Sequence, residues 1–182
     1  MATCVFGDSI VWGMCDSEGG WVKRLGRPVI ILGVCGERAA DLLKRIEREA
    51  RENKASSIII AIGTNDTYKE LLPVTPLEGF RKDIAELIRI SKNMTNKVAF
   101  IGLFPVGEEM RMYSCDNDSV QHYNNIIKGE CKKSKVLFID VFAEFIKRDY
   151  EKLLEDGLHP NSVGHKAMAE FIGPILIKNK LI

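Results

Sequence analysis

The chain has 182 residues, 46% hydrophobic and 28% charged, with 26 basic side chains against 25 acidic ones. This length suits one domain, residues 1–182, that buries about two thirds of the surface of the unfolded chain. No apolar run approaches the roughly 20 residues that span a bilayer, and the balanced charge offers no footprint for nucleic acid or anionic lipid, so a small molecule is the expected partner.

The cysteines indicate the redox environment that we expect. They are odd in number and form no C-x-x-C pair, so neither a disulfide framework nor a zinc site is indicated. The N-terminus runs from Met1 almost directly into an apolar run, without the pattern of a secretory signal. We therefore expect reduced thiols and a cytoplasmic protein.

Five apolar runs separated by helical patterns predict a parallel sheet that is covered on both faces. The predicted strands are Ala2–Phe6, Pro28–Leu32, Ser57–Ile62, Lys97–Leu103 and Lys135–Asp140. With right-handed crossovers, this order favours an α/β fold, a single-domain three-layer α/β/α sandwich of flavodoxin-like type.

Apolar stripes at helical spacing predict the covering helices. The stripes are Leu42, Leu43, Ile46 and Ala50; Phe80, Ile84, Leu87 and Ile88; Tyr123, Ile126, Ile127 and Cys131; and Met168, Phe171, Ile172, Ile175 and Leu176. Gly173-Pro174 is expected to kink or restart the last helix, because proline lacks a backbone N–H.

Two long connections, residues 63–75 and 104–118, leave the carboxyl ends of strands, where loops of α/β folds carry binding function. Their apolar members are candidates for a pocket wall, although simple anchoring of the loops explains them equally well. They are Leu71, Leu72, Phe104, Met110, Met112 and Tyr113.

Ser9 follows the first predicted strand in Phe6-Gly7-Asp8-Ser9-Ile10. Gly7 permits backbone angles that a residue with a Cβ resists, so we expect a sharp turn that presents Ser9 to the ligand crevice. Ser9 is then a candidate nucleophile, the alternative being a simple helix cap. As a nucleophile it needs a base, a group that orients the base, and donors for an oxyanion.

His159 is the candidate base, because Pro160 keeps it out of a helix and places it in a loop just before the last helical stripe. Asp156, three residues earlier across a turn at Gly157, can reach its Nδ1 and stabilise the imidazolium. A structural Asp-His pair is the alternative. Asp140, at the end of the last strand, is a rival orienting carboxylate.

Two further loops follow neighbouring strands and offer oxyanion donors. Asn65, in Gly63-Thr64-Asn65-Asp66 after the third strand, can direct its amide at an oxyanion beside Ser9. Gly36, after the second strand, can direct a backbone N–H to the same point without side-chain obstruction. A structural turn is the alternative for Asn65.

Taken together, Gly7-Asp8-Ser9, Gly36, Gly63-x-Asn65-Asp66 and Asp156-x-x-His159-Pro160 resemble the signature blocks of the SGNH (GDSL-type) hydrolases, and the resemblance covers almost the whole chain. It implies a flavodoxin-like fold, no metal or organic cofactor, and a nucleophile, base and acid at Ser9, His159 and Asp156. It also implies an oxyanion hole of Ser9 N–H, Gly36 N–H and Asn65. The first block ends in Ile10 rather than leucine, at a position that supplies no reacting group.

These residues predict hydrolysis of carboxylic esters through an acyl-enzyme on Ser9. The short loops of a compact single domain favour small acyl groups such as acetyl. Trp12 and Leu158, beside the reacting residues, are candidates for substrate contacts. An acyltransferase, or a module that binds an acylated sugar or lipid without turnover, is the alternative. A flavin or phosphoryl site is disfavoured, because no glycine-rich phosphate cradle is present, and Gly-x-Ser-x-Gly of the α/β-hydrolases is absent. The sequence carries no signature of oligomeric state.

Overall fold

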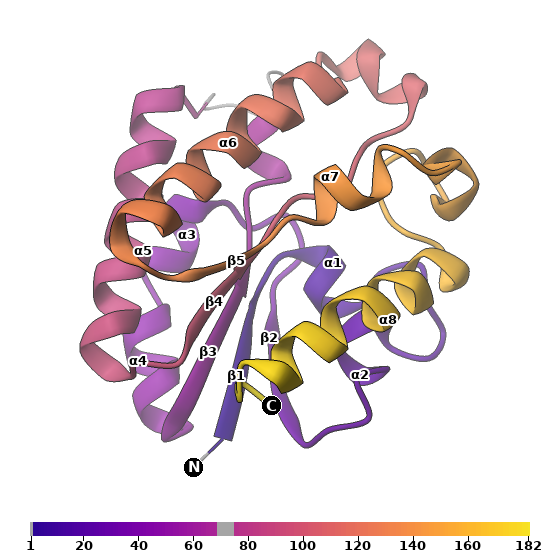
Figure 1. The fold of residues 1–182 in the computed structure, drawn as a ribbon. Helices are drawn as coiled ribbons and strands as arrows, with labels where there is room; N and C mark the ends of the chain where they lie inside the picture. Colours follow the sequence, from indigo (N-terminus) through magenta and orange to yellow (C-terminus); the bar gives the residue numbers. More distant parts are fainter. Residues whose placement is uncertain (1, 69–74) are drawn as a thin grey trace.

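A parallel sheet of five strands forms the centre of the molecule (Figure 1). The computed structural model describes residues 2–68 and 75–182. The strands are β1 (Ala2–Gly7), β2 (Val29–Gly33), β3 (Ala55–Ala61), β4 (Val98–Ile101) and β5 (Leu137–Ile139). Their order, β2-β1-β3-β4-β5, is the flavodoxin-like one, and all neighbours are parallel. The predicted fold is confirmed, and no predicted strand end is displaced by more than two residues.

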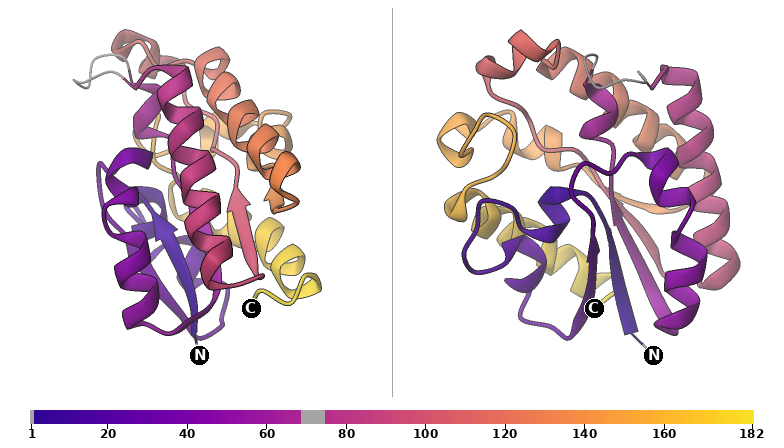
Figure 2. Two further views of the ribbon diagram at one scale, coloured as in Figure 1. Left: turned by 90° about the vertical axis from the view of Figure 1, so that its left-hand side faces the viewer. Right: turned by 180° about the vertical axis from the view of Figure 1, so that it is seen from behind.

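Helices cover both faces of the sheet (Figures 1 and 2). The α-helices are α1 (Ser9–Trp12), α2 (Gly20–Lys23), α3 (Ala39–Leu43), α4 (Ile46–Glu52), α5 (Leu77–Met94), α6 (Asn117–Ser134), α7 (Val141–Phe145) and α8 (Ser162–Lys178). Three 3₁₀ turns are η1 (Asn65–Thr67), η2 (Glu108–Tyr113) and η3 (Tyr150–Leu153). No helix within residues 2–68 and 75–182 is long and apolar enough to cross a membrane.

Alternation along the strands divides the core into two layers. Cys4 and Phe6 of β1 pack with α3 to α6, whereas Val5 between them packs with α1, α2, α7 and α8 on the other face. The strands therefore read as continuous apolar runs because both of their faces are buried. The chain ends close beside its start, where Thr3 Oγ1 donates a hydrogen bond of 2.8 Å to the Leu181 carbonyl.

The expected helix over residues 42–50 is wrong as one element, because α3 ends at Leu43 and α4 begins at Ile46. Arg45 stands at the break with non-helical angles, φ −126° and ψ −24°. Its guanidinium turns back to the end of β2, where it donates to the Leu32 carbonyl (2.9 Å) and to Glu37 Oε1 (2.6 Å). These bonds give hydrogen-bond partners to the buried side chain of Glu37 and to the Leu32 carbonyl, and a continuous helix would carry the Arg45 side chain away from both.

The expected restart at Gly173-Pro174 is also wrong, because α8 runs unbroken through Pro174. A proline inside a helix costs about 3 kcal/mol. The buried side chains of Met168, Ile172 and Leu176 on α8 offset this cost by packing against the sheet. Tertiary packing therefore outweighs the local preference.

Gly7 is required for a reason other than the expected backbone angle. Its φ is not in the left-handed region, but a Cβ on Gly7 would stand 2.0 Å from the Ala61 carbonyl oxygen and 2.5 Å from Val11 Cγ2. A Cβ on Gly33 of β2 would likewise stand 2.4 Å from the backbone nitrogen of Trp12. Helix α1 therefore packs directly on the carboxyl ends of β1 and β2, which fixes the position of its first residue, Ser9.

Candidate active site

Ser9, His159 and Asp156 form one chain of hydrogen bonds. Ser9 Oγ lies 2.9 Å from His159 Nε2, and His159 Nδ1 lies 2.7 Å from Asp156 Oδ2. Ser9 comes from the tip of β1 and the other two residues come from the loop before α8, so the fold joins residues that are 150 positions apart in sequence. A carboxylate, an imidazole and a hydroxyl in this order can move a proton away from the hydroxyl.

The loop that carries His159 is shaped by its own aspartate. Asp156 Oδ1 accepts hydrogen bonds from the backbone N–H groups of Leu158 (3.0 Å) and His159 (2.8 Å), and Gly157 between them has φ 78°. The Gly107 N–H donates to the Gly157 carbonyl at 2.7 Å, so the connection after β4 holds this loop from outside. The Asp156 carboxylate therefore both shapes the loop and orients the imidazole ring of His159.

The pKa of Asp156 lies below its usual value. Burial alone would raise this pKa, but the hydrogen bonds from the backbone and ring of His159 and from the Leu158 N–H outweigh burial. Asp156 is therefore ionised at neutral pH and can stabilise a positive charge on His159.

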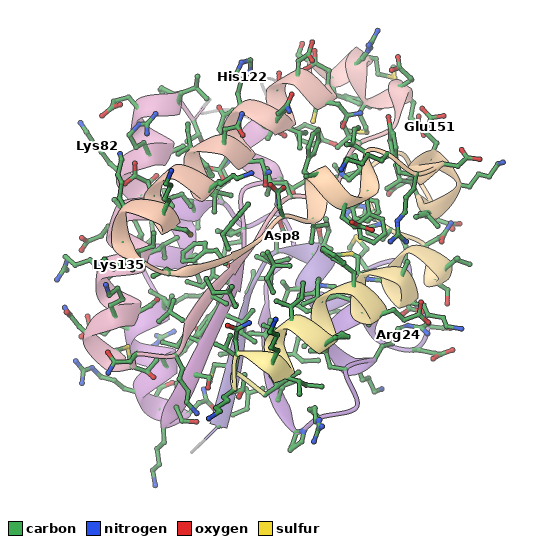
Figure 3. The ribbon with its side chains drawn as sticks, viewed as in Figure 1. Asp8, Arg24, Lys82, His122, Lys135 and Glu151 are labelled. Atoms are coloured by element: carbon green, nitrogen blue, oxygen red, sulfur yellow. The ribbon has the colours of Figure 1, made fainter. Side chains whose placement is uncertain are left out.

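Asp8 holds the turn that precedes the nucleophile candidate. Its side chain caps α1 by accepting a hydrogen bond of 3.0 Å from the Ile10 N–H, and it lies inside the protein near the middle of Figure 3. Burial, followed by the negative charges of Asp66 and Glu37, raises the pKa of Asp8 to about 7. Asp8 thus fixes the backbone of Ser9 from the inner side of the site.

Asn65 is buried on η1, and the loop that carries Gly36 holds it in place. Asn65 Nδ2 donates to the Glu37 carbonyl at 3.0 Å, and Asp66 Oδ2 accepts the Ala39 N–H at 3.0 Å. A side-chain amide has two hydrogens on its nitrogen, so the bond to Glu37 leaves a second donor. Gly36 itself is exposed at φ 77°, with open space where a Cβ would stand. The fold thus brings the Asn65 and Gly36 loops together at the tips of β3 and β2, on either side of β1.

The two candidate substrate residues occupy different environments. Trp12, the last residue of α1, is 56% exposed, whereas Leu158 is half-buried against the core layer of α3 to α6. Of these two residues, Trp12 presents the larger apolar surface to solvent.

The candidates for a pocket wall lie in different environments. Phe104 and Met110 are both buried in the core, and Phe104 also lines a small cavity together with Asp8 and Ile10. Met112 and Tyr113 are exposed on η2. Leu71 and Leu72 lie outside the described residues.

Asp140 does not orient His159. Its carboxylate accepts hydrogen bonds from Asn124 Nδ2 (3.0 Å), Lys128 Nζ (2.8 Å) and the Ala143 N–H (3.1 Å), and it caps α7. The turn-forming role of a terminal strand aspartate explains this residue.

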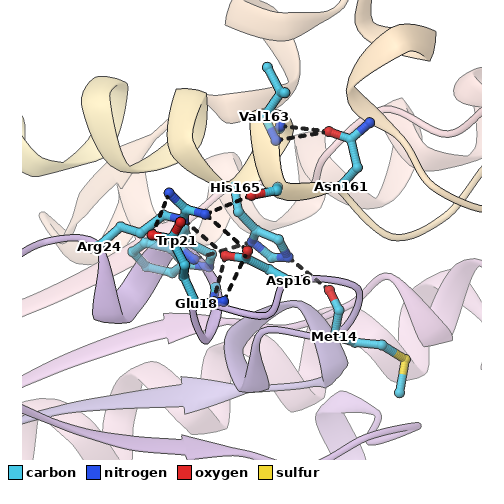
Figure 4. Close-up of polar contacts among 11 residues, drawn as sticks. Met14, Asp16, Glu18, Trp21, Arg24, Asn161, Val163 and His165 are labelled. Carbon is cyan, nitrogen blue, oxygen red and sulfur yellow. Dashed lines mark hydrogen bonds and ion pairs between the residues drawn. The ribbon is translucent and has the colours of Figure 1, made fainter.

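The other two histidines do not contact Ser9. His122 is exposed on α6, at the edge of the molecule (Figure 3). His165 is fully buried, and burial lowers its pKa, so it is neutral at physiological pH. Its Nδ1 accepts the Trp21 N–H at 3.2 Å and its Nε2 donates to the Met14 carbonyl at 2.9 Å (Figure 4).

A buried ion pair beside the site was not foreseen from the sequence. Asp16 accepts hydrogen bonds from Arg24 Nε and Nη2, both at 2.9 Å, and from the Gly20 N–H at 3.0 Å (Figure 4). Arg24 Nη2 also donates to Ser162 Oγ at 2.8 Å, at the first residue of α8. The Arg24 guanidinium holds the pKa of Asp16 far below its usual range. This clamp, Asp16-Arg24-Ser162, ties the segment after α1 to the helix that follows His159.

Cys15 lies between the clamp and the triad and was likewise not foreseen. Its sulfur, an Asp156 oxygen and a His159 ring nitrogen all lie within 4.8 Å of one another. Burial, followed by the negative charges of Asp156 and Glu155, raises the pKa of the thiol, which makes Cys15 a poor nucleophile. Because Cys15 and His159 lie far apart in sequence, no spacing motif announces this cluster.

Comparisons with known proteins identify the family of this chain. A model of the GDSL-like lipase/acylhydrolase family matches residues 5–167. The chain is 25% identical over 157 residues to an acetylxylan esterase from Geobacillus stearothermophilus, covering 80% of this chain and 70% of that protein.

Solved structures share the fold. A lipase/acylhydrolase from Enterococcus faecalis superposes with a TM-score of 0.83 at 21% identity, covering 97% of this chain and 95% of that one. An acetylxylan esterase from Geobacillus stearothermophilus gives a TM-score of 0.78 at 20% identity, covering 97% and 92%. Two further structures of that esterase, in which a serine or a histidine is replaced by alanine, are described as catalytic mutants.

The clamp generates a prediction about stability. Asp16→Ala leaves the Arg24 guanidinium without its buried partner, and we expect the free energy of unfolding at pH 7 to fall by about 3 kcal/mol. Because the pKa of Asp16 is depressed in the folded state, its contribution is present above the pKa of the unfolded chain, about 3.9, and is lost as the pH falls further. Urea unfolding at pH 7 measures the first effect, and a series from pH 7 down to about pH 2 measures how the difference between wild type and Asp16→Ala shrinks as the pH falls.

Asp149→Ala is the matched control, because the Asp149–Lys152 ion pair is solvent-exposed and should contribute little to the free energy of unfolding. A loss for Asp16→Ala no larger than that for Asp149→Ala would show that the clamp does not stabilise the fold.

Proposed function

The chain belongs to the GDSL-like lipase/acylhydrolase family and is a carboxylic ester hydrolase, and we propose that it works through an acyl-enzyme on Ser9. His159 is the general base and Asp156 the orienting acid in this proposal. The observation that carries it is the hydrogen-bond chain from the Asp156 carboxylate through His159 to Ser9 Oγ. The serine and histidine replacements described as catalytic mutants of the Geobacillus esterase support the same pair of residue types.

In the acylation step, Ser9 Oγ attacks the ester carbonyl carbon while His159 Nε2 accepts the hydroxyl proton. The carbonyl oxygen becomes an oxyanion, and ionised Asp156 stabilises the imidazolium at His159 Nδ1. When the tetrahedral intermediate collapses, the carbon–oxygen bond to the alcohol breaks and His159 gives its proton to the leaving oxygen. The acyl group stays on Ser9.

The oxyanion is held by the Ser9 N–H, the Gly36 N–H and the second amide hydrogen of Asn65. Support comes from the anchoring of Asn65, whose first amide hydrogen is occupied by the Glu37 carbonyl, so its donor direction is set before substrate arrives. Donors that are fixed in advance stabilise a developing charge without reorganisation.

Deacylation repeats the route with water. His159 Nε2 takes a proton from a water molecule that attacks the acyl carbon, and Ser9 leaves with that proton. The side chain of Asp156 is 49% exposed, so water can reach this edge of the site. Access of water supports hydrolysis over acyl transfer, because a transferase must exclude water. The complete triad in turn favours catalysis over binding without turnover.

The substrate we propose is an ester of a short acyl group, such as acetyl, on a carbohydrate. Ser9 is only 5% exposed, which leaves little room for a long chain beside it. The exposed indole of Trp12, together with Leu158 beside the base, offers apolar contact to the rest of the substrate. The acetylxylan esterase among the relatives supports the same substrate class.

We place the protein in the cytoplasm. Cys4 and Cys131 are free, buried thiols, and Cys15 and Cys35 are free, exposed ones. Free thiols persist most readily in a reducing compartment.

The first test is hydrolysis of p-nitrophenyl esters from acetyl to dodecanoyl. We expect turnover to be fastest for acetyl and to fall with chain length, because the acyl group must fit beside the nearly buried Ser9. Ser9→Ala should reduce turnover by at least about a thousandfold, because it removes the nucleophile. Initial rates of nitrophenol release measure both.

Ser17→Ala is the matched control, since Ser17 is exposed in the connection between α1 and α2, and it should keep the wild-type rate. Activity that survives Ser9→Ala in a folded protein would refute the acyl-enzyme on Ser9. A preference for long chains would refute the short-acyl substrate while leaving the nucleophile in place.

The second test addresses the oxyanion hole. Asn65→Ala removes one donor, and we expect kcat to fall by about a hundredfold or more with little change in KM, because the lost bond forms only in the transition state. Asn53→Ala is the control, because Asn53 Nδ2 also donates to a backbone carbonyl, that of Glu49, at the end of α4. An Asn65→Ala variant that unfolds at the same temperature as wild type and keeps full kcat would exclude Asn65 from the oxyanion hole.

A further inference from the structure

Cys15 sits where an ion could join it to two members of the triad. The segment between α1 and α2 runs past the loop before α8, and the sulfur of Cys15 faces Asp156 and His159 with mutual distances of at most 4.8 Å. Within residues 2–68 and 75–182, this is the one group of three such side chains close enough to share a metal ion.

The backbone is held in a costly conformation at this point. Cys15 has φ 64°, in the left-handed region that costs a residue with a Cβ about 1 kcal/mol or more. Its neighbours are fixed on both sides: His165 Nε2 donates to the Met14 carbonyl, and Asp16 is buried under Arg24 (Figure 4). The clamp therefore maintains the thiol beside the triad against the local preference of the chain.

The ligand types select the ion. A thiol, an imidazole and a carboxylate together suit Zn²⁺, which is bound by sulfur at about 2.3 Å and by nitrogen or oxygen at about 2.0–2.2 Å. Mg²⁺ and Ca²⁺ prefer sets of oxygen ligands, so this set disfavours them. Tetrahedral zinc places its ligand atoms about 3–4 Å apart, so the exposed side chain of Cys15 must turn by about 1 Å toward Asp156 and His159 on binding. Three protein ligands leave a fourth position for water.

We propose that Zn²⁺ binds Cys15, His159 and Asp156 and thereby switches the hydrolase off. On binding, the thiol releases its proton to solvent and coordinates as a thiolate. Metal at His159 Nε2 occupies the lone pair that would take the proton of Ser9, and metal at Nδ1 forces the ring hydrogen onto Nε2. In either case His159 no longer acts as a base. The loss of activity rests on the proposed function, whereas the metal site does not.

The binding experiment uses the full chain, stripped of metal with a chelator, in competition with a chromophoric zinc indicator at pH 7.5. We expect wild type to take up one equivalent of Zn²⁺ and Cys15→Ser to bind it at least about tenfold more weakly, because one of three ligands is weakened. Cys35→Ser should match wild type, because Cys35 is an exposed thiol outside the cluster. Ser9→Ala should also match wild type, because Ser9 is not a ligand.

The activity experiment measures p-nitrophenyl acetate hydrolysis with and without Zn²⁺, each variant against its own zinc-free rate. We expect wild type and Cys35→Ser to lose activity with zinc and to recover it with EDTA, and Cys15→Ser to need at least about tenfold more zinc for the same loss.

The outcomes separate the two proposals. Equal zinc affinity and equal inhibition in wild type and Cys15→Ser would overturn the metal site, with the hydrolase mechanism left standing. Zinc affinity that depends on Cys15 in a protein that hydrolyses no ester would support the metal site and refute the proposed function.

Discussion

The hydrogen bond between Ser9 Oγ and His159 Nε2 is the contact on which the other features of the site depend, because it joins the tip of the first strand to the loop before the last helix. A separate set of contacts positions each of these two residues. On one side, Gly7 and Gly33 let α1 pack directly on the strand ends, so the position of Ser9 follows from sheet geometry. On the other side, Asp156 shapes the loop through backbone bonds and orients the imidazole with its second oxygen.

The clamp, Asp16-Arg24-Ser162, connects the part of the chain that carries Ser9 to the part that carries His159. Arg24 bonds both Asp16, shortly after α1, and Ser162, at the start of α8, and His165 on α8 adds a bond to the Met14 carbonyl. These contacts join the segment around residues 14–24 to the start of α8, next to the triad. In the mechanism that we propose, the distance of 2.9 Å between Ser9 Oγ and His159 Nε2 depends on such support, because displacement by about 1 Å can cost a hundredfold in rate. The same support holds Cys15 in its strained conformation, so positioning the triad also creates the metal-binding cluster that we propose.

The fold, and the grouping of Ser9, His159 and Asp156 in one place, could be predicted from the sequence because their signals are local. Strands buried on both faces appear as apolar runs, and the residues of the site directly follow strands or precede the last helix. What could not be predicted depends on partners that are distant in sequence. Arg45 interrupts a helix to reach Glu37 and the end of β2, and Pro174 is tolerated because its helix is packed on both sides of it. Cys15 gave no signal, because only the folded chain brings it to His159.

Covalent labelling with a fluorophosphonate, read by mass spectrometry of the intact protein and its peptides, tests directly whether Ser9 is an activated nucleophile. Attack by an activated serine forms a bond from its Oγ to phosphorus and expels fluoride, so the label records nucleophilicity without any assumption about the substrate. We expect one label per chain on the peptide that contains Ser9, with labelling slowed at least about a hundredfold in His159→Gln because the base is lost. Labelling at another residue, or an unchanged rate in His159→Gln, would refute Ser9 as a nucleophile activated by His159.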